Sequence, residues 1–156
     1  MRRRFDRCDE VWPAGLGRRL GAMLYDGLLL LAIWVAIGAL HVAVSRLLLD
    51  IPAEQIGLGA AQVLSLRAMM ALSAFAFFAF FWRRAGMTLG MQAWRLRVQT
   101  RDGHAISLSQ SLLRFLVGTL SFVPFGLGHL WVLFDGERRS WADLASDTRV
   151  VVLPKR

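Results

Sequence analysis

Arg19 and Asp26 are the residues of this 156-residue chain whose types and spacing point most directly to chemistry. They stand seven positions apart in an apolar stretch, so on a helix they share one face, about 10 Å apart along the axis. Asp26 would lie roughly two turns inside a membrane, where an ionised carboxylate is costly. It must therefore pair with a cation, accept hydrogen bonds or carry a proton. Two interpretations stay open: a contact for an ion, a proton or a substrate, and a buried anchor that fixes helix packing.

His129 is the other titratable residue of interest, because it also lies in an apolar stretch. It is either an imidazole packed against a backbone carbonyl or a proton relay with Asp26. Motifs for metal hydrolysis, acyl transfer and nucleotide binding are missing from the sequence, and Cys8 alone cannot form a disulfide or a CxxC site. We therefore expect no enzymatic activity, no cofactor and no metal.

The elements that must position these residues are apolar. Hydrophobic residues make up 56% of the chain and charged residues 19%, and the mean hydropathy is +0.46. Three windows, 20–45, 60–82 and 109–134, contain only three charged residues, which are Asp26, Arg67 and Arg114. About 20 helical residues cross the hydrocarbon of a membrane. The sequence therefore predicts an all-α integral membrane protein with a single domain over residues 1–156.

Two of the windows predict full transmembrane helices, over about 19–45 and 60–82, after a flexible basic lead-in at 1–16. The third segment, about 109–134, is interrupted by a Pro/Gly-rich stretch at 123–128. Proline removes a helical hydrogen bond and glycine weakens a helix. This segment is either one kinked span or a re-entrant hairpin that enters and leaves on the same face.

A small β-structure is predicted between and after the apolar segments. Residues 95–100 alternate between polar and apolar, a turn with Asp-Gly follows at 101–104, and 105–108 completes a β-hairpin. The stretch 148–153 has a strand pattern as well. A third strand would stabilise the exposed hairpin, so we expect 148–153 to pair with it on the cytoplasmic side.

The basic residues, with a net charge of +8, flank the apolar segments and indicate topology rather than binding of nucleic acid. Six arginines precede the first span, one follows it, and five lie between the second and third segments. Cytoplasmic loops carry the excess of Lys and Arg. The N-terminus is therefore predicted to be cytoplasmic, and two crossings with a re-entrant third segment are favoured over three crossings.

Several segments in order resemble the RDD family of small multi-pass membrane proteins, which is named for one arginine and two aspartates. The segments that carry the resemblance are Gly17–Asp26, Gly86–Met91, Leu96–Val98, Gly126–Trp131 and Arg138–Val151. By this resemblance Arg19, Asp26 and Asp143 are the three name residues, and Arg114 falls where the family has an arginine. Together the matching segments reach from about Gly15 to Val152.

The resemblance implies an inner-membrane protein that transports an unidentified ligand, with cation/proton exchange as one activity. The alternative is a non-transporting scaffold or accessory subunit in which Arg19, Asp26 and Asp143 form a structural cluster. A cytoplasmic tail would bring Asp143 to Arg19 and place Arg138 and Arg139 near Asp26 or lipid phosphate. The expected partners are the bilayer, anionic lipid headgroups, and a second copy of the chain or another membrane protein.

Overall fold

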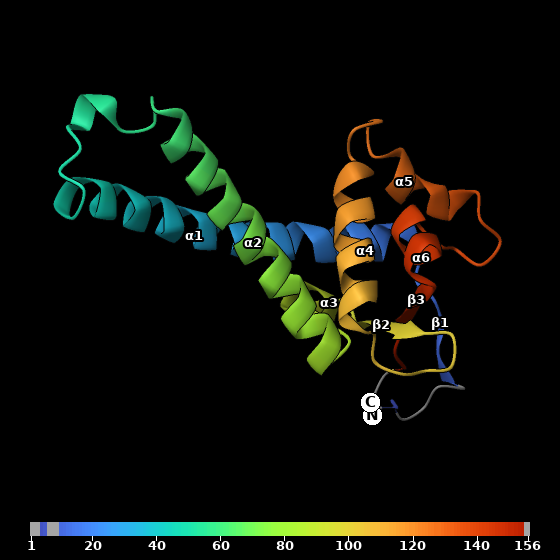
Figure 1. Cartoon of the computed structure of the whole chain (residues 1–156). Helices are drawn as coiled ribbons and strands as arrows, with labels where there is room; N and C mark the ends of the chain where they lie inside the picture. Colours follow the sequence, from blue (N-terminus) through green and yellow to red (C-terminus); the bar gives the residue numbers. More distant parts are fainter. Residues whose placement is uncertain (1–3, 6–9, 155–156) are drawn as a thin grey trace. The chain divides into compact units, whose positions relative to one another are not determined.

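A computed structural model describes residues 4–5 and 10–154 of the chain (Figure 1). The described part is mostly helical and carries one small antiparallel sheet of three strands. The chain divides into two compact units. One runs up to Asp26 and resumes at Phe77, and the other comprises Gly27–Ala76.

Two long apolar helices match the first two predicted spans. Helix α1 covers Leu16–Leu47 and helix α2 covers Ala60–Arg84, with 32 and 25 residues. At about 1.5 Å per residue they are about 48 and 38 Å long, which exceeds the roughly 30 Å of hydrocarbon in a bilayer. By length and composition both could cross a membrane, and within the described residues they are the two helices that could.

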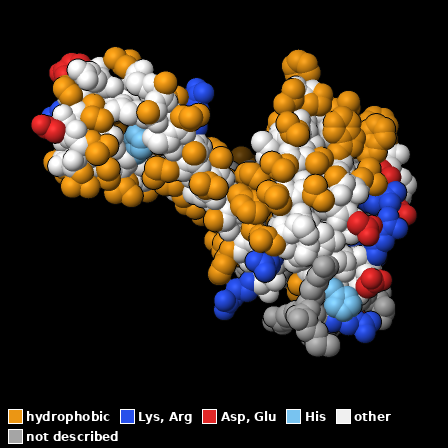
Figure 2. All heavy atoms as spheres, viewed as in Figure 1, with side chains coloured by type: hydrophobic (Ala, Val, Ile, Leu, Met, Phe, Trp, Pro, Cys, Tyr) orange, Lys and Arg blue, Asp and Glu red, His pale blue; other side chains and the backbone are white. Residues whose placement is uncertain are grey.

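The unit Gly27–Ala76 is a helical hairpin formed by the C-terminal part of α1 and most of α2. The connection contains a short 3-10 helix, η2 (Ala53–Gln55). Two side-chain hydrogen bonds join the two helices. Trp34 Nε1 donates to the Met70 carbonyl oxygen at 3.0 Å, and His41 Nε2 lies 2.9 Å from Ser65 Oγ. Figure 2 shows hydrophobic side chains over much of this unit, as expected for a surface that lipid covers.

The other unit contains the sheet, in the order β1–β3–β2. The strands are β1 (Trp12–Pro13), β2 (Leu96–Thr100) and β3 (Thr148–Val152), and β3 lies in the centre, antiparallel to both neighbours. The pairing predicted between 148–153 and 95–100 is confirmed, with a register from Leu96 opposite Val152 to Thr100 opposite Thr148. The two long strands contribute four side chains to a hydrophobic core: Leu96, Val98, Val150 and Val152. Its other members are Ala14, Ala22, Trp82, Met91 and Ile106.

The N-terminal lead-in differs from the prediction of a flexible segment over 1–16. Residues 1–3 and 6–9, and with them Cys8, lie outside the described residues. Trp12 and Pro13 form the edge strand β1, and Ala14 is completely buried. Proline is tolerated on an edge strand, because no partner needs its missing N–H. The Ala14 N–H donates to the Val150 carbonyl oxygen at 3.0 Å, which ties the lead-in to β3.

The predicted β-hairpin is wrong in its second arm. β2 ends at Thr100 and a tight turn follows, but residues 105–107 are not a strand and helix α4 begins at Leu108. Ser107 and Gln110 form a reciprocal capping box that starts this helix. The strand-like pattern of 105–108 is therefore overridden by a helix-start signal, and β3 takes the place next to β2 instead.

The third apolar segment is broken, as its proline and glycines predict. Helix α4 (Leu108–Leu120) has 13 residues, about 20 Å, and is too short to cross a membrane. Turns follow at 121–126, and Phe125 and Gly126 both have a positive φ. The segment then continues as α5 (Leu127–Leu130) and η3 (Trp131–Leu133), and α6 (Trp141–Ser146) leads into β3.

Candidate functional site

Asp143 is the centre of a buried ionic cluster, and its side chain is completely shielded from solvent. It stands in the first turn of α6, where its carboxylate accepts a hydrogen bond from the Ser140 N–H in a capping box. Its Oδ2 lies 2.7 Å from Arg19 Nη1, and its Oδ1 lies 2.6 Å from Arg114 Nη1. We call Arg19, Asp143 and Arg114 the ionic triad. It joins α1, α4 and α6 in one unit.

Each of the three nitrogens of the Arg19 guanidinium donates a hydrogen bond in this arrangement. Besides the Asp143 carboxylate, it donates from Nε to the Ala14 carbonyl oxygen at 3.1 Å and from Nη2 to the Arg138 carbonyl oxygen at 2.8 Å. Arg19 therefore connects the first turn of α1 to the residue that follows β1 and to the loop before α6. A lysine could not make this set of contacts, because they need the planar fork of arginine.

Arg114 approaches the triad from α4. Its Nη1 also donates to Thr148 Oγ1 at 2.5 Å, and its guanidinium lies 5.2 Å from the ring centre of Trp82. Its Nε is buried and has no hydrogen-bond partner among the described residues. Arg114 thus ties α4 to the first residue of β3 and to α2.

The charges of the triad determine the ionisation of Asp143. Burial alone would raise the pKa of its carboxyl, but the guanidinium groups of Arg19 and Arg114 outweigh it and hold the pKa below its usual range. The triad contains two guanidinium charges and one carboxylate, so it keeps a net charge of +1.

Asp26 has a different environment, made of neutral donors. Its Oδ2 accepts a hydrogen bond from Thr88 Oγ1 at 2.5 Å, and its Oδ1 accepts one from the Gly90 N–H at 2.9 Å. Thr88 is the N-cap residue of helix α3 (Leu89–Ala93), and its Oγ1 also accepts a hydrogen bond from the Met91 N–H. The carboxylate of Asp26 is 4% exposed and forms no ion pair within the described residues.

Gly90 allows α3 to come this close to α1. A Cβ at this position would lie 2.3 Å from the Ala22 carbonyl oxygen and 2.9 Å from Asp26 Oδ1. The first clash is with backbone, which cannot move aside cheaply. The absence of a side chain at Gly90 is therefore a condition of the hydrogen bond to Asp26.

The cluster expected from the sequence is thus divided in two. Arg19 and Asp143 are brought together, and Arg114 completes their triad, whereas Asp26 contacts Thr88 and Gly90 instead. The sequence left three possibilities for Asp26: pairing with a cation, accepting hydrogen bonds or carrying a proton. In the structure, Asp26 accepts hydrogen bonds. Arg19 and Asp26 share α1, but no hydrogen bond or ion pair joins them among the described residues.

Arg139 and His129 lie outside both groups. Arg139 is bound to Asp135, with Nε 3.0 Å from Oδ2 and Nη2 3.1 Å from Oδ1, and this pairing lowers the pKa of Asp135 to about 2. His129 Nε2 lies 3.0 Å from the Gly118 carbonyl oxygen, and its ring packs against Phe122. A carbonyl only accepts, so this nitrogen carries the hydrogen. No hydrogen bond links His129 to Asp26 within the described residues, so the proton relay has no direct contact here.

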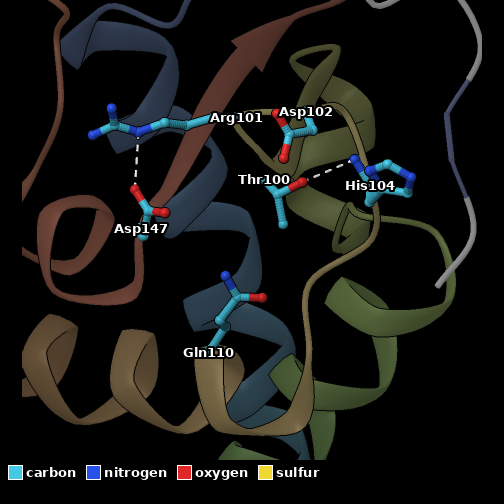
Figure 3. A pocket seen from close by; sticks show the side chains of 6 residues that line it. All are labelled: Thr100, Arg101, Asp102, His104, Gln110 and Asp147. Atoms are coloured by element: carbon cyan, nitrogen blue, oxygen red, sulfur yellow. Dashed lines mark hydrogen bonds and ion pairs between the residues drawn. The ribbon is translucent and has the colours of Figure 1, made fainter. Parts of the chain in front are cut away.

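An open polar pocket of about 430 Å³ lies elsewhere in the same unit (Figure 3). Its lining residues are Thr100, Arg101, Asp102, His104, Gln110 and Asp147. Figure 3 shows Arg101 and Asp147 pointing toward each other, and their Nε and Oδ1 are 2.9 Å apart. Both side chains are mostly exposed, and their charges compensate each other. The pocket contains none of the residues predicted from the sequence.

Among the residues that hydrogen-bond to Asp26 and the ionic triad, Thr88, Gly90, Ser140 and Thr148 were not predicted. For two of these residues the sequence contains a recognisable pattern. Thr88 and Ser140 each stand three residues before a residue that they cap, which is typical of a helix start. The described residues include no group of three His, Cys, Asp or Glu side chains that could hold a metal ion.

A comparison of the sequence with models of protein families agrees with the geometry of the ionic triad and of Asp26. The model of the RDD family matches residues 13–147, which includes the ionic triad and the Asp26 contacts. A search of curated proteins and a search of solved structures each found no match.

Proposed function

The chain belongs to the RDD family, and on that premise we propose that it is a multi-pass inner-membrane protein that exchanges protons or cations through Asp26. The proposal includes two membrane crossings, by α1 and α2, and a third segment that enters the bilayer from the cytoplasmic side and returns to it. Catalysis of a chemical reaction and a bound cofactor form no part of it.

The sheet supports this topology. β1 precedes the first crossing, β2 follows the second, and β3 follows the third apolar segment, yet all three strands belong to one sheet. A sheet cannot have strands on both sides of a bilayer, so these three parts of the chain share a side. The arginines of the same parts favour the cytoplasm for that side.

The third segment fits a re-entrant position. Helix α4 is too short to cross, and its leucines at positions 112, 113, 116 and 120 are exposed. Phe125, at the turn, is 99% exposed. Figure 2 shows hydrophobic side chains gathered over α4 and α5 in this unit. Such a large exposed apolar surface needs cover, and insertion into one leaflet supplies it.

The observation that carries the transport proposal is the environment of Asp26. Its two oxygens bind a hydroxyl and a backbone N–H, and no guanidinium holds it ionised. A hydroxyl can donate or accept. Thr88 can therefore keep its hydrogen bond to Asp26 when the carboxyl takes up a proton, which a fixed arginine partner would oppose.

Two crossings are too few to enclose a path across the bilayer, so the proposal requires a second copy of the chain or another membrane protein. The bilayer itself, with anionic headgroups against the basic cytoplasmic parts, is the other proposed partner.

Proton flux in proteoliposomes tests the proposal. The purified full chain is reconstituted with a pH-sensitive dye inside, and Na⁺ or K⁺ gradients are imposed. We expect cation-driven proton flux from the unchanged protein and at least a tenfold loss in Asp26→Asn, per folded molecule. Asn can keep both hydrogen bonds of Asp26, so this variant should fold. Asp102→Asn is the matched control, because Asp102 is exposed and has no part in the proposed mechanism. Unchanged flux in Asp26→Asn would contradict the role of Asp26.

The second candidate is a non-transporting scaffold, and the ionic triad favours it. Asp143 is fully paired and joins α1, α4 and α6, as expected for a structural role. If the unchanged protein moves no proton, Na⁺ or K⁺, this candidate replaces the first.

A further inference from the structure

A second cavity in the unit that contains the sheet has a strongly basic lining. Its volume is about 210 Å³, and it lies where β1, β3 and the loop at 135–139 meet the first turn of α1. Four arginines line it: Arg19, Arg138, Arg139 and Arg149. We call it the arginine pocket.

Two of these arginines are already neutralised. Arg19 is paired with Asp143, and Arg139 is paired with Asp135 and lies 3.5 Å from Glu137 Oε2. Glu137 is the one acidic residue among the described residues of the lining, and it is thus engaged with Arg139 as well. The ionic triad, which includes Arg19, keeps its net charge of +1. The pairing of Arg19 with Asp143 therefore does not make this side of the pocket negative.

The other two arginines, Arg138 and Arg149, form no ion pair within the described residues. Arg149 Nε is buried and has no hydrogen-bond partner there. A buried donor without a partner costs free energy, and an anion in the pocket would satisfy it.

Arg138 is held in position by its backbone. Its φ is 54°, in the left-handed region that a residue with a side chain seldom adopts. Its carbonyl oxygen accepts the hydrogen bond from Arg19 Nη2, which keeps the loop in this conformation. A Cβ at Gly15 would lie 3.3 Å from Arg138 Nη1, so the guanidinium lies close against the chain just before α1. Backbone strain of this kind is often retained at binding sites.

We infer that the arginine pocket binds a phosphate group, with Arg138 and Arg149 as its two cationic ligands. Guanidinium groups match the oxygens of phosphate in geometry and charge. Trp12, which is 49% exposed, also lines the pocket and adds apolar surface to it. Tryptophan of this kind is typical of the headgroup level of a membrane. The phosphate belongs either to a lipid headgroup or to a free phosphate compound. The inference does not depend on transport through Asp26.

Thermal unfolding of the full chain in neutral detergent tests the inference in two arms. One arm adds inorganic phosphate or glycerol phosphate, and the other adds short-chain phosphatidic acid or phosphatidylglycerol. Potassium chloride at matched ionic strength and short-chain phosphatidylcholine are the reference additions. We expect a saturable rise of about 3–6 °C in the unfolding midpoint at about ten times the dissociation constant.

Arg138→Gln and Arg149→Gln should each weaken the apparent affinity at least tenfold. Arg101→Gln removes the same charge from an exposed residue outside the arginine pocket and should leave the affinity unchanged. If Arg149→Gln does not fold, Arg138→Gln decides, because the Arg138 side chain is exposed in a loop. A response in the lipid arm alone identifies a headgroup, and a response in both arms identifies the phosphate group itself. No saturable response in either arm, or an unchanged response in Arg138→Gln, would overturn the inference.

Discussion

Removal of Asp143 should destabilise the protein more than removal of either arginine of the ionic triad. The triad holds two guanidinium groups and one carboxylate, all buried. Asp143→Ala leaves two like charges facing each other without a counter-charge, whereas Arg19→Ala leaves the neutral pair of Asp143 and Arg114. Loss of one member of a buried ion pair typically costs about 3–5 kcal/mol. We expect this cost for Asp143→Ala.

Arg19→Ala should cost less, about 1.5–3 kcal/mol, which is the usual contribution of hydrogen bonds to a charged group. The double variant should lose less than the sum of the two, by about 1–3 kcal/mol, because the residues are in direct contact. The measurement is unfolding by denaturant in detergent, followed by tryptophan fluorescence. Arg101→Ala serves as the control, because its ion pair with Asp147 is exposed. Strict additivity, or a larger loss in Arg19→Ala than in Asp143→Ala, would refute the reasoning.

The ionic triad also predicts that the stability of the protein depends on pH. The pKa of Asp143 is lower in the folded protein than its ordinary value near 4. The stability that this group contributes is therefore fully present above about pH 4 and is lost as the pH falls through the folded value. Asp143→Asn should remove this part of the acid sensitivity. An acid unfolding profile that is identical in Asp143→Asn and the unchanged protein would contradict it.

Two further predictions concern the contact of α3 with α1 and the topology. Gly90→Ala should lower the free energy of unfolding by about 1–3 kcal/mol, because its Cβ would lie 2.3 Å from the Ala22 carbonyl oxygen. The control is Gly38→Ala, because a Cβ at this position would meet nothing within 4 Å. Its free energy of unfolding, measured in the same detergent, should not fall. Reporters fused to the N-terminus and to the C-terminus should both report the cytoplasm, and one inserted at 53–55 the opposite side. A periplasmic C-terminus would separate β3 from β2 and contradict the proposed topology.

The sequence predicts the long helices and the central strand pair because each has a pattern of its own. Nearly charge-free windows of more than 20 residues indicate α1 and α2. The alternation in 95–100 indicates β2, and the valine-rich strand pattern of 148–153 indicates β3. β1 has two residues, one of them proline, and no periodicity can reveal a strand so short. Its place in the sheet depends on the edge that β3 offers.

The contacts of Asp26 could not be predicted from the sequence, for a physical reason. A spacing of seven puts Arg19 and Asp26 on one helix face, but about 10 Å of axial separation is too far for a direct hydrogen bond. Their partners must come from other segments. Thr88 is 62 positions away from Asp26, and Asp143 is 124 positions away from Arg19. Only the assembled fold decides which of them meet.

The separation of the two acidic residues agrees with the contacts of Arg19. Three of its five N–H donors go to the Ala14 carbonyl, the Asp143 carboxylate and the Arg138 carbonyl, so the guanidinium is held by partners other than Asp26. Asp26 is consequently left to the hydroxyl and N–H at the start of α3, which can accommodate either protonation state. Asp143 is thus held by two arginines, whereas the partners of Asp26 are neutral. The two proposed roles can be separated by experiment, because we expect a change at Asp143 to act on stability and, if the proposed function holds, a change at Asp26 to act on flux.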